Sequence, residues 1–175
     1  MDVYTEIFEL IDMRSFSNLW FWIMLAVMWS STSHWVLGVP WDMVTRAQRA
    51  DDPQKTHDVD VLTHINSRRI VDIAEQTGLL MAGFGCFVLT MLALLGFIYE
   101  HEFSQALFLL GFPMSLVGLI CIGSARRILQ EGMQGDDLFR MMRRHRTVTQ
   151  VVGMVSIFVT GLWGMMQNFN FSALN

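Results

Sequence analysis

The stretch QTGLLMAGFGCFVLTMLALLGFIY, residues Gln76–Tyr99, runs for 24 residues without Asp, Glu, Lys or Arg. An α-helix needs about 20 apolar residues to cross a hydrocarbon core of ~30 Å, so this stretch predicts a transmembrane helix. Three further stretches are equally free of charge: Ser15–Trp41, Phe103–Ala125 and Thr147–Asn175. The sequence therefore predicts an all-α polytopic membrane protein, a single domain over residues 1–175, with four transmembrane helices at about 18–38, 77–99, 104–125 and 148–168.

The overall composition points the same way. Hydrophobic residues make up 53% of the chain and charged residues 16%, and the mean hydropathy is +0.39. Soluble domains carry about 25% charged residues. The sequence contains none of the phosphate-binding, dinucleotide-binding, zinc-protease or C-x-x-C motifs that mark common catalytic sites. We therefore expect a membrane protein that is not an enzyme.

The basic residues define the expected orientation. Of the 12 Lys and Arg residues, all but Arg14 fall in two loops, 39–76 and 126–147. Because loops rich in Lys and Arg stay in the cytoplasm, these two are the expected cytoplasmic loops. The resulting prediction is a multi-pass protein of a bacterial inner membrane with its N-terminus and C-terminus in the periplasm.

Shorter helices are expected beside the four spans. Residues Asp2–Met13 place apolar and acidic side chains on different faces, which predicts an amphipathic interfacial helix at the periplasmic surface. Between the first two spans we expect a short helix at Trp41–Ala50, and then a helix that begins near Asp58 and continues into the membrane. The third span should also extend into the cytoplasm as a helix and end at Gly132.

Small residues form a repeating pattern on the last three spans. Helices associate in lipid by close packing of such residues and by side-chain hydrogen bonds, so each pattern predicts a packing face. An alternative for the last span is a polar transport pathway along Thr149–Gly164. Pro113 should kink the third span and open a small cavity, where a ligand could enter. The predicted packing residues are Gly78, Ala82 and Cys86 in the second span, Gly111, Ser115 and Gly118 in the third, and Gly153, Ser156, Thr160 and Gly164 in the fourth.

Two histidines are candidate cofactor ligands. His34 lies near the cytoplasmic end of the first span and His145 at the cytoplasmic edge of the fourth. A membrane haem typically needs two axial ligands at similar depth, and only this pair offers them. The simpler interpretation is an interface histidine at position 34 and a headgroup- or partner-facing one at position 145. We expect no metal site and no cofactor, although bound lipid is expected.

Basic residues on the expected cytoplasmic face are candidates for contact with lipid headgroups or an acidic partner. Anionic lipids attract such residues by about 1 kcal/mol each near the surface. The apolar residues of the helical extensions either pack together or form a docking face that these arginines surround. Nucleic acid is not an expected partner, because aromatic residues are not interleaved with the basic cluster. The candidate arginines are Arg68, Arg69, Arg143 and Arg144.

Two segments carry a resemblance to a known group of proteins. FELIDMRSFSNLW at Phe8–Trp20 and SHWVLGVP at Ser33–Pro40 resemble small four-span inner-membrane proteins of Rhodobacter-like alphaproteobacteria. The resemblance implies an inner-membrane location and transfers no role to an individual residue. The tryptophan-rich first span and the acidic surface helix are also similar to features of accessory subunits in bacterial energy-converting complexes.

These observations lead to a functional hypothesis. The chain is expected to be a non-catalytic accessory or assembly subunit of a larger, energy-converting inner-membrane complex, because packing faces are abundant and ionisable residues within the spans are limited to His34. Its expected partners are membrane lipids and either other inner-membrane subunits or further copies of itself. Two alternatives stay open: a small transporter or channel component, and a haem- or pigment-binding membrane protein.

Overall fold

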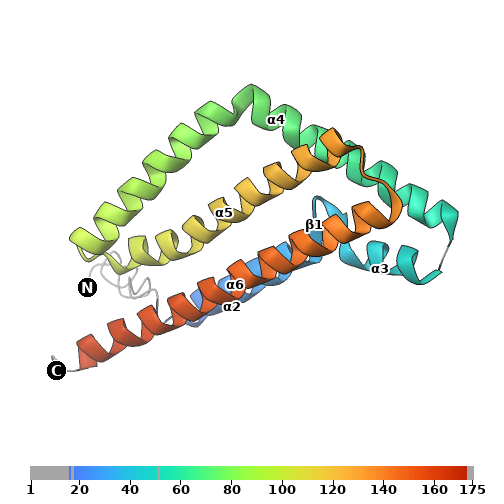
Figure 1. Ribbon diagram of the computed structural model, residues 1–175. Helices are drawn as coiled ribbons and strands as arrows, with labels where there is room; N and C mark the ends of the chain where they lie inside the picture. Colours follow the sequence, from blue (N-terminus) through green and yellow to red (C-terminus); the bar gives the residue numbers. More distant parts are fainter. Residues whose placement is uncertain (1–15, 17, 51, 173–175) are drawn as a thin grey trace, which may run out of the picture.

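The computed structural model in Figure 1 describes residues 16, 18–50 and 52–172. The interfacial helix expected at Asp2–Met13 lies outside these residues. Apart from one very short hairpin, the described chain is helical, as the sequence predicts. In chain order its elements are α2 (Leu19–His34), β1 (Trp35–Val36), β2 (Val39–Pro40), α3 (Trp41–Ala50), α4 (Pro53–Ala93), the π-helix η2 (Leu94–Ile98), α5 (Glu102–Glu131) and α6 (Gly135–Ser172).

Three helices are long and apolar enough to cross a membrane: Pro53–Ile98, Glu102–Glu131 and Gly135–Gln167. Each is longer than a span requires, and its charge-free part is the stretch suited to hydrocarbon. The helix α2 differs, because its 16 residues rise only about 24 Å. The first predicted span, 18–38, is therefore wrong in its extent: within the described residues it ends as a helix at His34, where a hairpin begins.

The hairpin Trp35–Pro40 explains where α2 stops. Trp35 pairs with Pro40 and Val36 with Val39 in antiparallel register. The two residues between the strands, Leu37 and Gly38, have φ angles of 52° and 75°. Positive φ at both central positions is the mark of the tight hairpin turns that match the twist of the strands. The chain thus reverses at once and leads directly into α3.

The other helix boundaries follow local signals. The helix α3 covers the predicted range, Trp41–Ala50. The helix α4 begins at Pro53, earlier than the predicted Asp58, because the side chain of Asp52 accepts a hydrogen bond from the Gln54 N–H at 3.0 Å and caps the helix. At the end of α5, Gly132 adopts the left-handed conformation that commonly terminates helices.

A compact core surrounds the hairpin, and we call it the hairpin core. It joins the hairpin and α3 to the first part of α4, the end of α5 and the start of α6. The apolar residues of the helical extensions therefore pack largely against one another, although Ile65 and Ile73 on α4 stay 57% and 47% exposed. The buried members are Val36, Leu37, Val39, Val44, Ala47, Val59, Ala125, Ile128, Leu138, Phe139 and Met142.

The long helices are arranged unevenly around this core. Figure 1 shows α2 lying along α6, and α4 (teal to green) bent into two limbs. The second limb runs back to meet α5, where η2 and the short connection before Glu102 join the two helices. A second, smaller core links α2 to α5 through Leu25, Trp29 and Val117.

Candidate functional site

One face of α6 is buried along most of the helix, and we call it the α6 seam: Thr149, Gly153, Ser156, Thr160 and Gly164. Its glycines lie where α2 approaches. A Cβ atom at Gly153 would lie 2.7 Å from Cε3 of Trp29, and one at Gly164 would lie 3.2 Å from Cζ2 of Trp22. The indoles of α2 thus rest on the α6 backbone. The structure brings all four predicted packing residues of this helix into the interior.

The hydroxyl groups of the α6 seam are buried without partners. Thr149, Ser156 and Thr160 are at most 7% exposed, and their oxygens have no hydrogen-bond partner among the described residues. The indole N–H of Trp29 is also buried and has no hydrogen-bond partner among the described residues. A buried hydroxyl without a partner costs about 1–3 kcal/mol, so the helix packing around the α6 seam has to offset this cost.

The predicted packing residues of α5 behave less uniformly. A Cβ at Gly111 would lie 3.6 Å from Leu89 of α4, an ordinary packing contact. Ser115 is exposed and donates a hydrogen bond to the Phe112 carbonyl in its own helix at 2.6 Å. Gly118 is exposed as well, and no described atom beyond its own helix lies within 4 Å of a Cβ built there. Of the two glycines, only Gly111 would bring a Cβ within 4 Å of another helix in the described structure.

The second half of α4, Gly78–Ala93, has no buried residue in the described structure, and we call it the α4 limb. Within the described structure, nothing comes within 4 Å of a Cβ built at Gly78, and Ala82 and Cys86 are exposed. Leu89 follows Gly78 and Ala82 by three and two helical turns, so all three share the face that touches α5 at Gly111. The predicted faces of α4 and α5 therefore point toward each other, and Leu89 lies beside Gly111.

The two candidate ligand histidines have different surroundings. His34 is exposed, and its Nε2 lies 3.8 Å from a carboxylate oxygen of Asp42. His145 is 6% exposed, and its Nδ1 lies 2.9 Å from the Ser124 hydroxyl. Burial lowers the pKa of His145, which precedes the charge-free part of α6. No group of three His, Cys, Asp or Glu side chains suited to a metal occurs in the described ranges.

The four arginines predicted to face lipid or partners are all exposed. Arg143 donates a hydrogen bond to the Gln48 side chain of α3 at 3.3 Å. Arg144 lines a hollow of about 440 Å³ where α5 turns into α6. Arg68 and Arg69 lie on α4, so the four predicted basic residues are divided between two helices.

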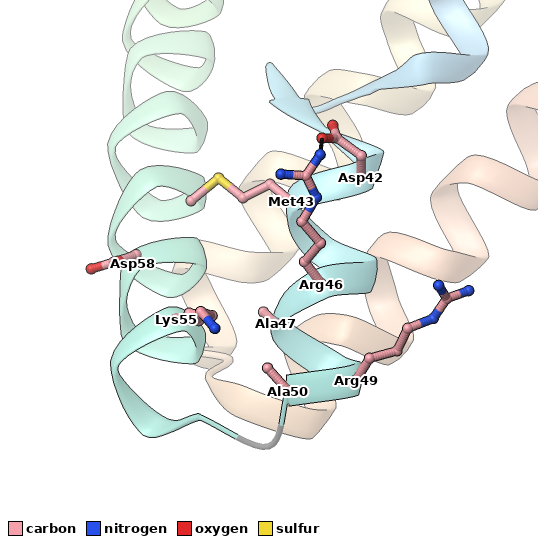
Figure 2. Close-up of a pocket in the computed structure, with 8 residues that line it drawn as sticks. All are labelled: Asp42, Met43, Arg46, Ala47, Arg49, Ala50, Lys55 and Asp58. Atoms are coloured by element: carbon pink, nitrogen blue, oxygen red, sulfur yellow. Dashed lines mark ion pairs between the residues drawn. The ribbon is translucent and has the colours of Figure 1, made fainter.

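A mixed-charge groove lies between α3 and the start of α4. It has a volume of about 420 Å³, and Figure 2 shows Lys55 directed into the gap between the helices while Arg49 and Asp58 point outward on opposite sides. Arg46 pairs with Asp42 at 2.9 Å, and Lys55 with Asp52 at 3.4 Å. Since these cations are already matched by neighbouring carboxylates, the groove offers little net charge to a ligand.

A buried glutamine connects the far ends of three helices, and the sequence pattern did not single it out. Gln105 is 3% exposed. Its Nε2 donates to the Gly96 carbonyl at 2.8 Å, and its Oε1 accepts from Trp163 Nε1 at 2.9 Å and from Gln167 Nε2 at 3.0 Å. The feature of the sequence that could have identified Gln105 is its amide side chain just inside a charge-free stretch. Amide side chains within membrane helices commonly form hydrogen bonds to neighbouring helices.

Arg146 was also missed as a specific contact. Its Nε donates to the Ser33 carbonyl at 3.2 Å, and its guanidinium carbon lies 4.5 Å from the centre of the Trp41 ring. The hydrogen bond joins the end of α2 to α6, and the cation–π contact joins the start of α3 to α6.

The described geometry thus contains a closed, polar seam on α6, a bare limb on α4 and a clamp at Gln105. Comparison of the chain with protein-family models, curated proteins and solved structures found no match.

Proposed function

We propose that this chain is a non-catalytic accessory or assembly subunit of a larger energy-converting complex in a bacterial inner membrane. The observation that carries the proposal is the bare α4 limb. We compared the 18-residue stretch of each long helix that is best suited to a membrane. No residue of this stretch is buried in α4, whereas 17% of the stretch is buried in α5 and 28% in α6. A limb with small residues and no covering helix in the described chain is suited to pack against a neighbouring subunit.

The glycines of the α4 limb support this proposal. A Cβ built at Gly78, Gly83 or Gly85 has no described atom beyond its own helix within 4 Å. Each glycine weakens a helix by about 1 kcal/mol relative to alanine. Lipid chains do not require small residues, whereas a second helix gains contact area when the backbones approach closely. A partner helix therefore accounts for the composition of the limb better than lipid does.

The proposed topology has α2 as a fourth, short span and both termini in the periplasm. Trp22 and Trp29 contact α6 at Gly164 and Gly153, which lie within the charge-free stretch of α6, and this favours placing α2 at membrane depth. Its rise of about 24 Å is shorter than a ~30 Å core, a mismatch that local thinning of the bilayer accommodates at modest cost. The Lys and Arg residues in the two loops support the orientation.

The alternative of a transporter receives less support. A pathway along the α6 seam would have to be wet, but Trp22 and Trp29 pack directly on its glycines. The pigment alternative rests on His34 and His145, and the contacts of these residues are with Asp42 and Ser124.

Site-specific photo-crosslinking in native membranes tests the proposal. A benzophenone amino acid replaces Met81, which flanks the face of Gly78 and Gly85, in one variant and Phe158 on α6 in the other; the two side chains are 60% and 67% exposed. We expect a discrete protein adduct from position 81, identifiable by mass spectrometry, and mainly lipid adducts from position 158. Lipid adducts alone at position 81, or equal protein adducts at both positions, would contradict docking through α4.

A further inference from the structure

The hollow where α5 turns into α6 has its charges sorted by depth. Its lining includes three arginines and two carboxylates around a volume of about 440 Å³. Arg127 lies two residues beyond the charge-free stretch of α5, and Arg144 lies three residues before that of α6, so both are within ~5 Å of the membrane boundary along their helices. Glu131 and Asp137 lie ~9 Å and ~15 Å beyond the same boundary. The cationic side of the hollow is therefore the side nearer the membrane.

The arginines of the hollow have little of their charge neutralised by firm ion pairs. Arg127 Nε lies 2.8 Å from a carboxylate oxygen of Glu131, and Arg140 Nη1 lies 3.8 Å from one of Asp137. The side chains of both pairs are about half exposed or more, and exposed ion pairs contribute little to stability. Arg144 has no carboxylate within 4 Å in the described part of the chain. A phosphate group, which guanidinium groups bind in a bidentate manner, suits this arrangement.

A second, apolar groove of about 310 Å³ lies deeper between the same two helices. Leu116 of α5 and Val151 of α6 line the groove, and Arg127 and Arg144 line the hollow. On α5, Leu116, Gly123 and Arg127 are spaced by seven and four residues, so they share one helix face. On α6, Arg144 and Val151 are seven residues apart and share a face in the same way. The groove and the hollow therefore lie in line on one side of the α5–α6 pair.

The groove has the lining and depth that suit an acyl chain. Its accessible walls are apolar, because the hydroxyl oxygens of Ser156 and Thr160 are buried beneath them. On α6 it extends from Val151 to Thr160, ~6 Å to ~20 Å inside the membrane boundary, and one leaflet of the hydrocarbon core is ~15 Å thick. Between the groove and the hollow, Gly123 presents no side chain, and no described atom beyond its own helix lies within 4 Å of a Cβ built there.

We propose that the hollow and the groove together bind one anionic glycerophospholipid, from the leaflet on the side of the two arginine-rich loops. Its phosphate lies beside Arg127 and Arg144, and one acyl chain passes Gly123 into the apolar groove. A zwitterionic lipid fits less well, because its headgroup cation would stand among arginines, and a soluble phosphate would leave the groove empty. The inference rests on the membrane location of α5 and α6 and is independent of the proposed subunit role.

Native mass spectrometry of the full chain in dodecyl maltoside tests the headgroup site. The chain is titrated separately with dioleoyl phosphatidylglycerol and dioleoyl phosphatidylcholine, and we expect the anionic lipid to bind about tenfold more tightly. Arg127→Gln combined with Arg144→Gln should weaken binding of the anionic lipid about thirtyfold. The matched control combines Arg126→Gln with Arg143→Gln, which removes the same charge at the same depth from residues outside the hollow, and it should keep most of the affinity.

A second pair of variants tests the acyl-chain path without changing charge. Gly123→Leu should obstruct the path and weaken binding of dioleoyl phosphatidylglycerol about tenfold. Gly118→Leu is the matched control, because it lies on the same helix about 140° around the axis and should bind like the unaltered chain. Neither glycine has a described atom beyond its own helix within 4 Å of an added Cβ, so the fold can accept both leucines. Thermal unfolding of each variant checks that the fold is retained.

Four results would overturn the proposal. Equal affinity for the anionic and zwitterionic lipids shows that the hollow does not recognise charge. Equal affinities of the two double arginine variants show that the residues of the hollow have no special role. Equal affinities of the two leucine variants show that no acyl chain passes position 123. Displacement of the lipid by an equal concentration of sn-glycerol 3-phosphate identifies a site for soluble phosphate instead.

Discussion

The α6 seam and the α4 limb carry similar small residues at similar spacing but lie in opposite surroundings. At Gly153 an added Cβ would meet Trp29 at 2.7 Å, whereas at Gly78 it would meet no described atom within 4 Å. The difference lies in α2, which supplies large indoles to α6, while α4 has no comparable neighbour in the described chain. The same pattern of small residues is therefore packed in one helix and uncovered in the other, so the pattern alone does not identify what lies against it.

The largest effect is expected from filling the α6 seam. Gly153→Leu should lower the free energy of unfolding by about 3 kcal/mol, because the new side chain occupies the space of the Trp29 ring. Denaturation in mixed detergent micelles, followed by tryptophan fluorescence, measures the change. The control is Gly161→Leu on the same helix, where no described atom lies within 4 Å of a Cβ. Equal destabilisation by both variants would show that the seam is not specifically packed.

A smaller loss is expected where the α4 limb is fastened at its far end. Gln105→Leu removes three hydrogen bonds and leaves Trp163, Gln167 and the Gly96 carbonyl without that partner. Because such bonds contribute roughly 0.6–1.7 kcal/mol each in membrane proteins, we expect a loss of about 2 kcal/mol in the same denaturation assay. Gln76→Leu, at an exposed position on α4, should have little effect. A stable Gln105→Leu variant would mean that the limb is held by other contacts.

A pH effect should distinguish the interior of the bundle from the bare limb. Burial lowers the pKa of His145 below its ordinary value, so the unfolded chain takes up the proton first as pH falls. The stability that neutral His145 contributes is therefore complete well above pH 6.5, the ordinary value of its pKa, and declines as pH falls through that value toward the lower folded-state pKa. Melting temperatures at pH 7.5 and 5.5 measure it. His145→Gln, which keeps a polar group beside Ser124, should remove this part of the pH dependence.

The smallest effect on the chain itself is expected on the α4 limb. Gly78→Leu combined with Gly85→Leu should change the free energy of unfolding by no more than about 0.5 kcal/mol relative to alanine at the same two positions, because leucine and alanine have similar helix propensities and both positions are uncovered in the described structure. The leucine variant should no longer co-purify with the partner captured at position 81. Retention of that partner with two added leucines would show that the glycines do not form the interface.

Much of the helical framework could be predicted from local patterns. The charge-free stretch Gln76–Tyr99 predicted the membrane part of α4, and Gly132 predicted the end of α5, where the structure gives this glycine the left-handed conformation. The interruption of the first span could not be predicted, because Trp35–Pro40 is as apolar as the helix before it and its turn depends on positive φ at Leu37.

The candidate sites show where sequence patterns stop being informative. The spacing of Gly153 and Ser156 predicted that α6 has a packing face, and the structure places both in the interior. The same spacing gave no means of foreseeing that α2 covers α6 while α4 stays bare, because that choice depends on tertiary contacts. The Gln105 clamp depends in the same way on partners 58 and 62 residues away.

The pairing of α2 with α6 has a consequence for synthesis of the protein. The first long helix of the described chain packs against the last, and Arg146 bonds to the Ser33 carbonyl across 113 residues. At about 5–20 residues per second, a ribosome needs roughly 6–23 seconds to make that intervening chain. During this interval α2 has been synthesised, but α6, whose glycines pack against the indoles of α2, has not. Trp22 and Trp29 are therefore the side chains that a chaperone or insertase would have to shield until the C-terminal helix arrives.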